Sequence, residues 1–133
     1  REARDNVAIA LVRKGEGGEL WVAEVDGRGV GFMLLEFTRV WGHEGEAFEG
    51  EGVCIDWFDV HPEFQRKGIG GALLQRAEAR AVERELHRLF AHTAVTNLAM
   101  VNFASKNGFK FTKHLGEFWG KGTGDAYLLV KEL

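Results

Sequence analysis

The 133-residue sequence predicts an α/β fold with a mixed, mostly antiparallel sheet flanked by helices, and three observations support this class. Apolar runs that alternate like strands are interleaved with stretches of helical periodicity. An Asp-Gly pair separates two of these strands, and a glycine-rich loop later joins a strand to a helix. The length and the apolar content of 45% predict a single domain over residues 1–133 with its own hydrophobic core.

The first predicted elements follow from periodicity and turn residues. Residues 3–14 carry apolar side chains at helical spacing and end before a glycine, so we expect a helix there. Strands are expected at 19–25 and 29–40, because Asp26-Gly27 between them is a strong hairpin signal. Residues 41–52 are rich in glycine and glutamate and predict an exposed loop. Its carboxylates either attract a cationic acceptor or only keep the loop solvated; they are Glu44, Glu46, Glu49 and Glu51.

The second half of the chain alternates strands and helices. A strand is expected at 53–60, where His61-Pro62 ends it, and a helix at 67–86. A further strand at 88–95 is followed by a helix at 97–108, which Asn97 begins and Gly108 ends. The last two strands form a closing hairpin over 109–119 and 125–133. The buried face of the first of these helices is predicted to carry Leu73, Leu74, Ala77, Ala81 and Leu86.

Charge and cysteine content narrow the function classes. A formal net charge of −3 argues against a nucleic-acid partner held by bulk attraction. Cys54 is the only cysteine, which excludes an internal disulfide and a cysteine-rich zinc site, so no metal site is predicted. No apolar run reaches the roughly 18 residues of a membrane span, and no signal peptide is visible. We therefore expect a cytoplasmic protein with no membrane partner, whose state, monomer or homodimer, the sequence leaves open.

The stretch "EFQRKGIGGALL" at 63–74 is the most specific feature of the sequence. Glycines behind a strand and at the start of a helix expose several backbone N–H groups at one place, where the helix dipole is positive. This arrangement favours a phosphate cradle, although tight packing alone would also use such glycines. A nucleotide P-loop motif is absent, and Leu73 stands where a dinucleotide-binding fingerprint needs glycine or alanine.

The run from Gln65 to Gly70 reads Gln/Arg-x-x-Gly-x-Gly/Ala and resembles the acyl-CoA pyrophosphate signature of the GNAT superfamily of N-acetyltransferases. Residues 97–109, which begin with Asn and end in Gly-Phe, resemble the second signature of this family. The resemblance implies a sheet splayed between its two central strands and acetyl-CoA as cosubstrate. It also implies an N-acetyltransferase acting on a primary amine, or alternatively a CoA-binding sensor or complex subunit without efficient catalysis.

The resemblance also implies the site residues. The Val60 N–H is the expected donor to the thioester carbonyl, and Asp56 is the candidate base, with Asp59 and His61 as alternatives. Alternation along a strand puts Asp56 on one face with Phe58 and Val60. Asp56 could instead serve only to bond nearby backbone or a cation. The expected cofactor-binding residues are Phe58, Asp59, Val60, Gln65, Arg66, Lys67, Gly68, Ile69, Gly70, Gly71, Asn97 and Phe103.

Two features depart from the family pattern. Many members carry a tyrosine four residues before the glycine of the Gly-Phe pair as general acid to the thiolate, and here that position is Ala104. Members also normally begin with a strand and one or two helices before the hairpin that matches 19–40. Only one helix is predicted there, so the first strand and first helix are expected to be absent from this chain. The acceptor amine is therefore left unidentified.

Overall fold

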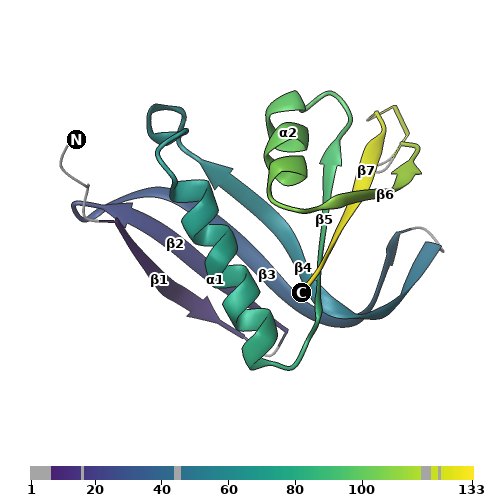
Figure 1. The fold of residues 1–133 in the computed structure, drawn as a ribbon, viewed down its shortest axis with the longest axis horizontal. Helices are drawn as coiled ribbons and strands as arrows, with labels where there is room; N and C mark the ends of the chain where they lie inside the picture. The colour runs from purple at the N-terminus through teal and green to yellow at the C-terminus, as the bar shows by residue number, and fades with distance from the viewer. Residues whose placement is uncertain (1–6, 16, 44–45, 118–120, 123) are drawn as a thin grey trace.

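The computed structural model of the chain describes residues 7–15, 17–43, 46–117, 121–122 and 124–133, and only the backbone of 38–43 and 46–51. These residues form a seven-stranded sheet and two α-helices (Figure 1). The elements are β1 (Val7–Lys14), β2 (Gly18–Val25), β3 (Arg28–His43), β4 (Glu46–Val60), a 3₁₀ turn (Pro62–Phe64), α1 (Ile69–Glu83), β5 (Arg88–Ala94), α2 (Leu98–Lys106), β6 (Lys110–Leu115) and β7 (Ala126–Glu132).

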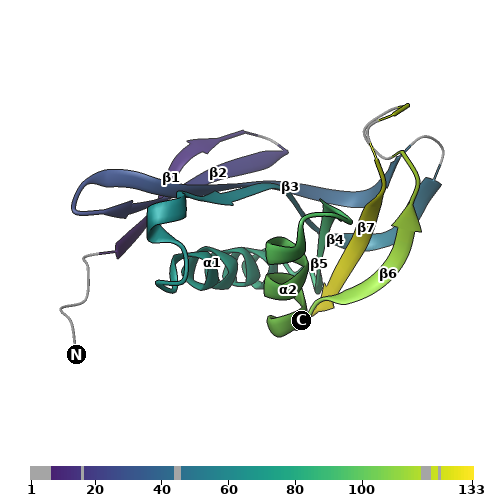
Figure 2. The ribbon, with the colours of Figure 1, turned by 90° about the horizontal axis from the view of Figure 1, so that it is seen from above.

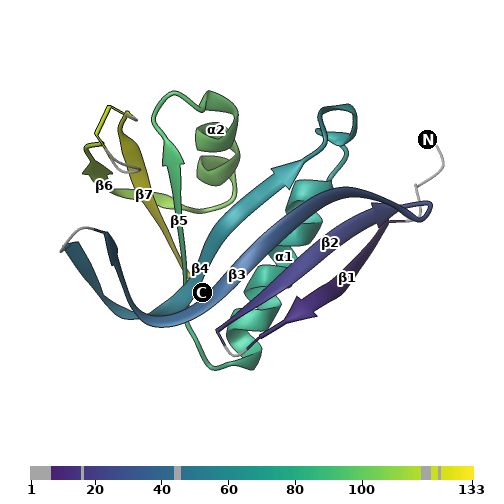
Figure 3. The same ribbon diagram turned by 180° about the vertical axis from the view of Figure 1, so that it is seen from behind.

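The sheet has the strand order β1-β2-β3-β4-β5-β7-β6. Neighbouring strands are antiparallel except for β4 and β5, which run parallel because α1 connects them as a crossover. Both helices lie on one face of the sheet, and the other face of β1 to β4 carries no described helix (Figures 2 and 3). The predicted mixed, mostly antiparallel sheet flanked by helices is confirmed.

The N-terminal segment corrects two predictions. The helix expected over 3–14 is wrong from Val7 onward, because Val7–Lys14 is strand β1, while residues 3–6 lie outside the described residues. Its Val7, Ile9 and Leu11 lie opposite Val25, Ala23 and Trp21 of β2, so tertiary pairing decides the structure of a sequence with ambiguous spacing. The expected absence of a first strand is therefore also wrong. Only three residues separate β1 from β2, too few for a helix.

The glycine-rich segment at 41–52 is not the predicted loop. Strands β3 and β4 continue through it and pair as far as His43 and Glu46, forming a long hairpin that curls away from the rest of the sheet (Figure 1). Register shifts between Thr38 and Val40 accompany the curl. Glycine content is a weak signal against a strand when a neighbouring strand can complete its hydrogen bonds. The carboxylates expected to attract a cation lie outside the described side chains.

Both helices match their predictions and differ only at their ends. The buried face of α1 carries Leu73, Leu74, Ala77 and Ala81 as expected, and Ile69 in addition, while Leu86 lies beyond its end. The Asn97 side chain accepts a hydrogen bond from the Met100 N–H at 3.2 Å and so caps α2. Gly108 follows α2 with a φ of 89°, as a left-handed residue after a helix requires. Neither helix is long and apolar enough to span a membrane.

A buried ion pair ties α1 to β2. Arg80 donates from Nε and Nη2 to the two carboxylate oxygens of Glu19 at 2.9 and 2.7 Å, and Trp21 Nε1 donates to the same carboxylate at 3.0 Å. Glu19 is only 1% exposed. The hydrogen bonds from Arg80 lower the pKa of Glu19 in spite of its burial. This contact fixes α1, and therefore the loop before it, against the sheet.

Candidate active site

Strands β4 and β5 are paired at one end and separated at the other. The strands pair through three residues each: Val53, Cys54 and Ile55 of β4 lie opposite Leu89, Phe90 and Ala91 of β5. Beyond these residues β4 and β5 do not pair with each other. Beyond this point β4 runs toward α1 and β5 runs toward α2 (Figure 1). The predicted splaying of the sheet between its two central strands is confirmed, and the pairing ends five residues before Val60 and two residues before Thr93.

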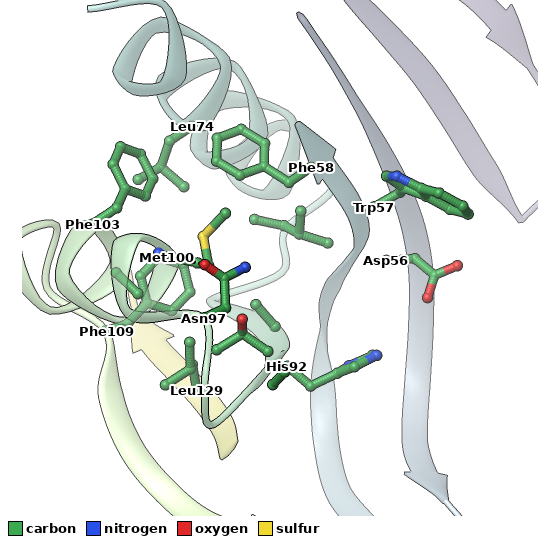
Figure 4. A pocket seen from close by; sticks show the side chains of 15 residues that line it. Asp56, Trp57, Phe58, Leu74, His92, Asn97, Met100, Phe103, Phe109 and Leu129 are labelled. Carbon is green, nitrogen blue, oxygen red and sulfur yellow. Dashed lines mark hydrogen bonds between the residues drawn. The ribbon is translucent and has the colours of Figure 1, made fainter. Parts of the chain in front are cut away.

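The separation of the strands leaves a cavity of about 370 Å³ (Figure 4). Residues from β4, β5, both helices and β7 line it, and most of them are apolar. Among the expected site residues, Asp56, Phe58, Asn97 and Phe103 belong to this lining. The rings of Phe58 and Phe103 lie 5.5 Å apart and wall the cavity beside α1. The full lining comprises Ile55, Asp56, Trp57, Phe58, Leu74, Ala91, His92, Thr93, Ala94, Asn97, Met100, Phe103, Ala104, Phe109 and Leu129.

A β-bulge at Asp56 changes the orientation of the candidate base. Leu34 lies opposite Trp57 and Leu35 lies opposite Ile55, so Asp56 is the extra residue in β4. Phe58 points into the cavity on the helix side, whereas Asp56 and Trp57 point to the opposite face (Figure 4). The expectation that Asp56 shares a face with Phe58 and Val60 is therefore wrong. Strict alternation fails where a bulge inserts one residue.

The main chain at the end of β4 has hydrogen-bonding groups that face away from β3. His61 donates its N–H to the Val30 carbonyl at 2.7 Å, which fixes the alternation of hydrogen bonds at this end. Because residues of an antiparallel strand face their neighbour alternately, the N–H groups of Phe58 and Val60 point toward the gap. The Val60 carbonyl also faces away from β3, because it accepts a hydrogen bond from the Gln65 side-chain amide at 2.9 Å.

The glycine-rich loop presents the uncapped start of α1 beside this gap. Arg66 and Gly68 have φ values of 62° and 83°, and no side chain caps the first turn of α1. Turns that contain left-handed residues can bring successive N–H groups to one side, which is the arrangement found in anion-binding nests. A Cβ at Gly70 would lie 3.3 Å from the Phe103 ring, so Gly70 also permits close packing against the cavity wall. A Cβ at Gly71 would meet open space.

The remaining expected residues lie close to this loop but differ in what their side chains offer. Arg66 and Lys67 are exposed, and the Lys67 ammonium lies 5.4 Å from the centre of the Phe64 ring. Ile69 is buried in the core, so only its main chain is available to a ligand. Asp59 is exposed. The alternative base His61 accepts a hydrogen bond from the Glu63 N–H at 3.2 Å and caps the 3₁₀ turn.

A second carboxylate stands beside Asp56 on the adjacent strand. Burial raises the pKa of Glu36, and the neighbouring Asp56 carboxylate raises it further. Cys54 lies directly opposite Glu36 in the β3–β4 register and is fully buried. Burial likewise raises the pKa of the Cys54 thiol, with further contributions from Asp56 and then Glu36. This thiol therefore stays protonated at neutral pH and is a poor nucleophile.

Sequence reasoning missed one polar residue of the cavity, His92. It lies on β5 and lines the cavity together with Asp56 (Figure 4). Only the pairing of β4 with β5, which ends at Ile55 and Ala91, brings the next residues of the two strands, Asp56 and His92, to the same end of the gap. That register joins residues more than thirty positions apart and has no local signal in the sequence.

The family model described as the acetyltransferase (GNAT) family matches residues 2–109, so the chain belongs to the GNAT acetyltransferase family.

Solved structures of similar fold agree with this assignment. A GNAT family acetyltransferase from Elizabethkingia anophelis with acetyl-CoA bound is 22% identical, with a TM-score of 0.78, 97% of this chain and 99% of that chain being covered. Ard1 from Thermoplasma volcanium is 23% identical, with a TM-score of 0.72 and coverages of 86% and 70%. The ribosomal-protein-S18-alanine N-acetyltransferase from Escherichia coli is 18% identical, with a TM-score of 0.71 and coverages of 90% and 71%.

Proposed function

We propose that the protein transfers an acetyl group from acetyl-CoA to a primary amine of a small molecule, peptide or protein. The observation that carries the proposal is that the uncapped start of α1 lies next to the open β4–β5 gap, since Gly70 of this turn lies beside Phe58 and Phe103, which line the cavity. The start of α1 offers N–H groups for a pyrophosphate, and the end of β4 offers them for a thioester. Membership of an acetyltransferase family supports the same reaction.

In this proposal the cofactor runs along the gap between the two strands. Its pyrophosphate lies on the N–H groups from Gln65 to Gly71, with Arg66 and Lys67 at the edge toward the 3′-phosphate. The pantetheine arm follows the main chain of Phe58, Asp59 and Val60, and on its other side it meets Phe103 and the start of α2 at Asn97. The Val60 N–H, which points into the gap, donates to the thioester oxygen as charge develops there.

The transfer needs a neutral amine, although an alkyl amine has a pKa of about 10.4 and is charged at neutral pH. Asp56 lines the cavity on the face opposite the helices, and we propose that it helps to remove the proton. The amine nitrogen then bonds to the acetyl carbon, the carbon–sulfur bond breaks, and the sulfur leaves with its electron pair. One proton reaches the sulfur to give CoA thiol, and one proton is released overall.

A CoA-binding sensor or complex subunit without efficient catalysis is the second candidate function. The observation that favours it is Ala104, which lines the cavity and is 4% exposed where many family members carry the tyrosine that protonates the thiolate. A thiolate is nevertheless a tolerable leaving group that water can protonate. This candidate predicts CoA binding without turnover.

An acceptor screen that follows the release of CoA thiol tests the proposed function. The wild-type protein should bind acetyl-CoA in the micromolar range, about −8 kcal/mol, and release thiol faster with at least one amine than without. Pre-steady-state measurement separates slow chemistry from slow product release. Tight binding with no amine-dependent thiol release from a broad panel would favour the sensor instead.

The variant Asp56→Asn tests the role of the candidate base, because it keeps the shape and removes the charge. We expect kcat at neutral pH to fall by about 10²–10⁴-fold while acetyl-CoA binding stays nearly unchanged. High pH should partly restore the rate, because the free amine then forms unaided. Glu24→Gln on β2, outside the cavity, is the matched control. Full turnover of Asp56→Asn across pH 6–9 would make Asp56 a structural residue.

A further inference from the structure

The cavity contains a second titratable side chain that the mechanism above does not use. Among the described residues that line it, only Asp56 and His92 have ionisable side chains. We propose that His92 is a further catalytic residue, which takes the proton of the acceptor amine in concert with Asp56. The inference rests on the proposed acetyl transfer and adds to it the face from which the amine arrives.

The burial pattern of β5 fixes the side to which His92 points. Leu89 and Ala91 pack in the main core under the helices, whereas Phe90 belongs to a second apolar cluster with residues of β6 and β7. Alternation along the strand puts His92 on the same face as Phe90, opposite the helices. Figure 4 agrees, because the imidazole extends from β5 toward the side of β4 that carries the Asp56 carboxylate.

Asp56 and His92 occupy equivalent positions on the two strands. The last register pair is Ile55 with Ala91, so each of the two is the first residue after the pairing ends. Their side chains therefore stand at the base of the gap, on the face not covered by a described helix. An acetyl group held in the gap would be open to an amine arriving from that face.

The charged and titratable groups around His92 favour its protonated form after transfer. Asp56 faces it from β4, with Cys54 two residues earlier on that strand and Glu36 beside both on β3. On the other side Leu128 of β7 lies opposite His92, and Lys113 of β6 lies opposite Leu128. Asp56 is on the strand next to β5, whereas Lys113 is two strands away, and a neighbouring carboxylate stabilises an imidazolium.

Imidazole suits this task better than a carboxylate alone. An unperturbed histidine has a pKa of about 6.5 and an aspartate about 3.9, and proton transfer is most efficient when the pKa of the base is near the working pH. In the step, the amine nitrogen forms its bond to the acetyl carbon as its proton passes to His92. The carbon–sulfur bond breaks with its electron pair on sulfur. The imidazolium or water then protonates the thiolate.

Steady-state kinetics and a titration by NMR test the inference. The probes are acetyl-CoA with four amines: spermidine, phenethylamine, N-acetyl-lysine amide and a peptide with a free α-amine. His92→Gln should lower kcat/KM by about 10²–10⁴-fold at pH 7 and remove the acidic limb of the pH profile, while the KM for acetyl-CoA stays within twofold. His87→Gln, at an exposed histidine just before β5, is the matched control. In the otherwise unchanged protein, Asp56→Asn should lower the pKa of the His92 imidazole measured by NMR.

The outcomes are separable. If the His92→Gln variant turned over as fast as the wild type across pH 6–9, the proposed role of His92 would be wrong and the proposed function would stand. A wild-type protein inert with all four amines would overturn the proposed function and this inference with it. The NMR titration needs no turnover and no folded His92 variant, and an imidazole pKa unchanged by Asp56→Asn would contradict the pairing.

Discussion

The boundary between β4 and β5, called the β4–β5 seam from here on, is paired at one end and open at the other, and the two ends have different roles. At the paired end, Val53, Ile55 and Leu89 are buried together under α1, and the strands hold the two halves of the sheet together. At the open end, which begins at the β3–β4 bulge at Asp56, β4 and β5 no longer pair, and the rings of Phe58 and Phe103 line the space between them. The same pair of strands therefore provides stability over one length and a cavity over the next.

The candidate site contains main-chain hydrogen-bonding groups of β4 that would otherwise be used in pairing with β5. Had β5 continued along β4, the N–H groups of Phe58 and Val60 would bond to it and no cavity would remain. Unpaired main chain in a protein interior normally costs free energy, so a ligand that completes these bonds is a natural occupant. Substitutions in the closed regions, which are the paired end of the seam and the contact of α1 with the sheet, should change the free energy of unfolding. Substitutions at the open end should change the affinity for CoA.

The largest effect on stability is expected in the closed region that positions α1. Arg80→Met leaves the Glu19 carboxylate buried without its ion-pair partner, which should lower the free energy of unfolding by about 3–5 kcal/mol. Denaturant unfolding measures this. The pKa of Glu19 is lowered in the folded state, so the pair stabilises above the unfolded carboxyl pKa and ceases to do so as pH falls through the folded one. The deficit of Arg80→Met should accordingly shrink in acid.

A matched variant at the surface separates burial from charge pairing. Arg88 donates to Glu132 at 2.7 Å, as short as the contact in the core, but its side chain is 35% exposed. Arg88→Met should cost less than about 1 kcal/mol. If Arg80→Met and Arg88→Met lowered the free energy of unfolding by equal amounts, the buried Arg80–Glu19 pair would not be what holds α1 in place.

Replacing a glycine by alanine should change stability in opposite directions at the paired end of the seam and at the start of α1. A Cβ at Gly52, next to the paired end, would lie 2.4 Å from the Phe90 ring and 2.8 Å from the Arg88 carbonyl oxygen. Gly52→Ala should therefore destabilise by about 1–3 kcal/mol through overpacking. Gly71→Ala, whose Cβ meets open space in the first turn of α1, should stabilise by about 0.5–1 kcal/mol. Thermal unfolding of both variants checks the signs, and a destabilised Gly71→Ala would contradict the geometry of this turn.

At the open end, Gly71→Glu should weaken CoA binding at least about tenfold, or roughly 1.4 kcal/mol, by placing a carboxylate beside the phosphate cradle. A carboxylate at a helix N-terminus stabilises the helix, so weaker binding would not reflect a damaged fold. Calorimetry with CoA gives the affinity, and Gly71→Ala is the control for bulk. Unchanged affinity of the glutamate variant would remove the pyrophosphate from this turn.

The smallest effect is expected at Glu36, beside the bulge. Burial and then the Asp56 carboxylate raise its pKa, so the folded state holds a proton that the unfolded state has released. Stability then falls as pH rises from the unfolded pKa to the folded one. Glu36→Gln should remove this loss and stabilise the protein at pH 7 by a few tenths of a kcal/mol. The effect is small because Glu36 is only partly buried, and solvent screens the exposed part of its side chain. Parallel stability profiles of variant and wild type from pH 4 to 8 would contradict it.

Local signals in the sequence were sufficient for much of the fold. Asp26-Gly27 forms the predicted hairpin turn with φ values of 50° and 81°, and Asn97 caps α2 as its position suggested. The glycine loop lies at the start of α1, as its residues predict. By contrast, β1 was mistaken for a helix, because Val7–Lys14 carries few buried residues and takes its structure from pairing with β2.

The candidate site was predictable only where the main chain carries it. The motif at 65–70 predicts the place of the glycine loop at the start of α1 without knowledge of the rest of the fold. The side chains at the cavity depend instead on a bulge that turns Asp56 to the opposite face and on a register that brings His92 to it. Both are consequences of strand pairing between distant segments. Neither the bulge nor the register has a signature within the local sequence.

The central claim, that acetyl-CoA occupies the open end of the seam, is tested most directly by following the backbone amides by NMR during titration with CoA. We predict the largest shift changes at Phe58, Val60 and Gly68 to Gly71, with smaller ones at the start of α2. The amides of Val53 to Ile55 and Leu89 to Ala91, already bonded in the sheet, should change little. Saturable changes confined to other parts of the chain, or no change at millimolar CoA, would contradict the account.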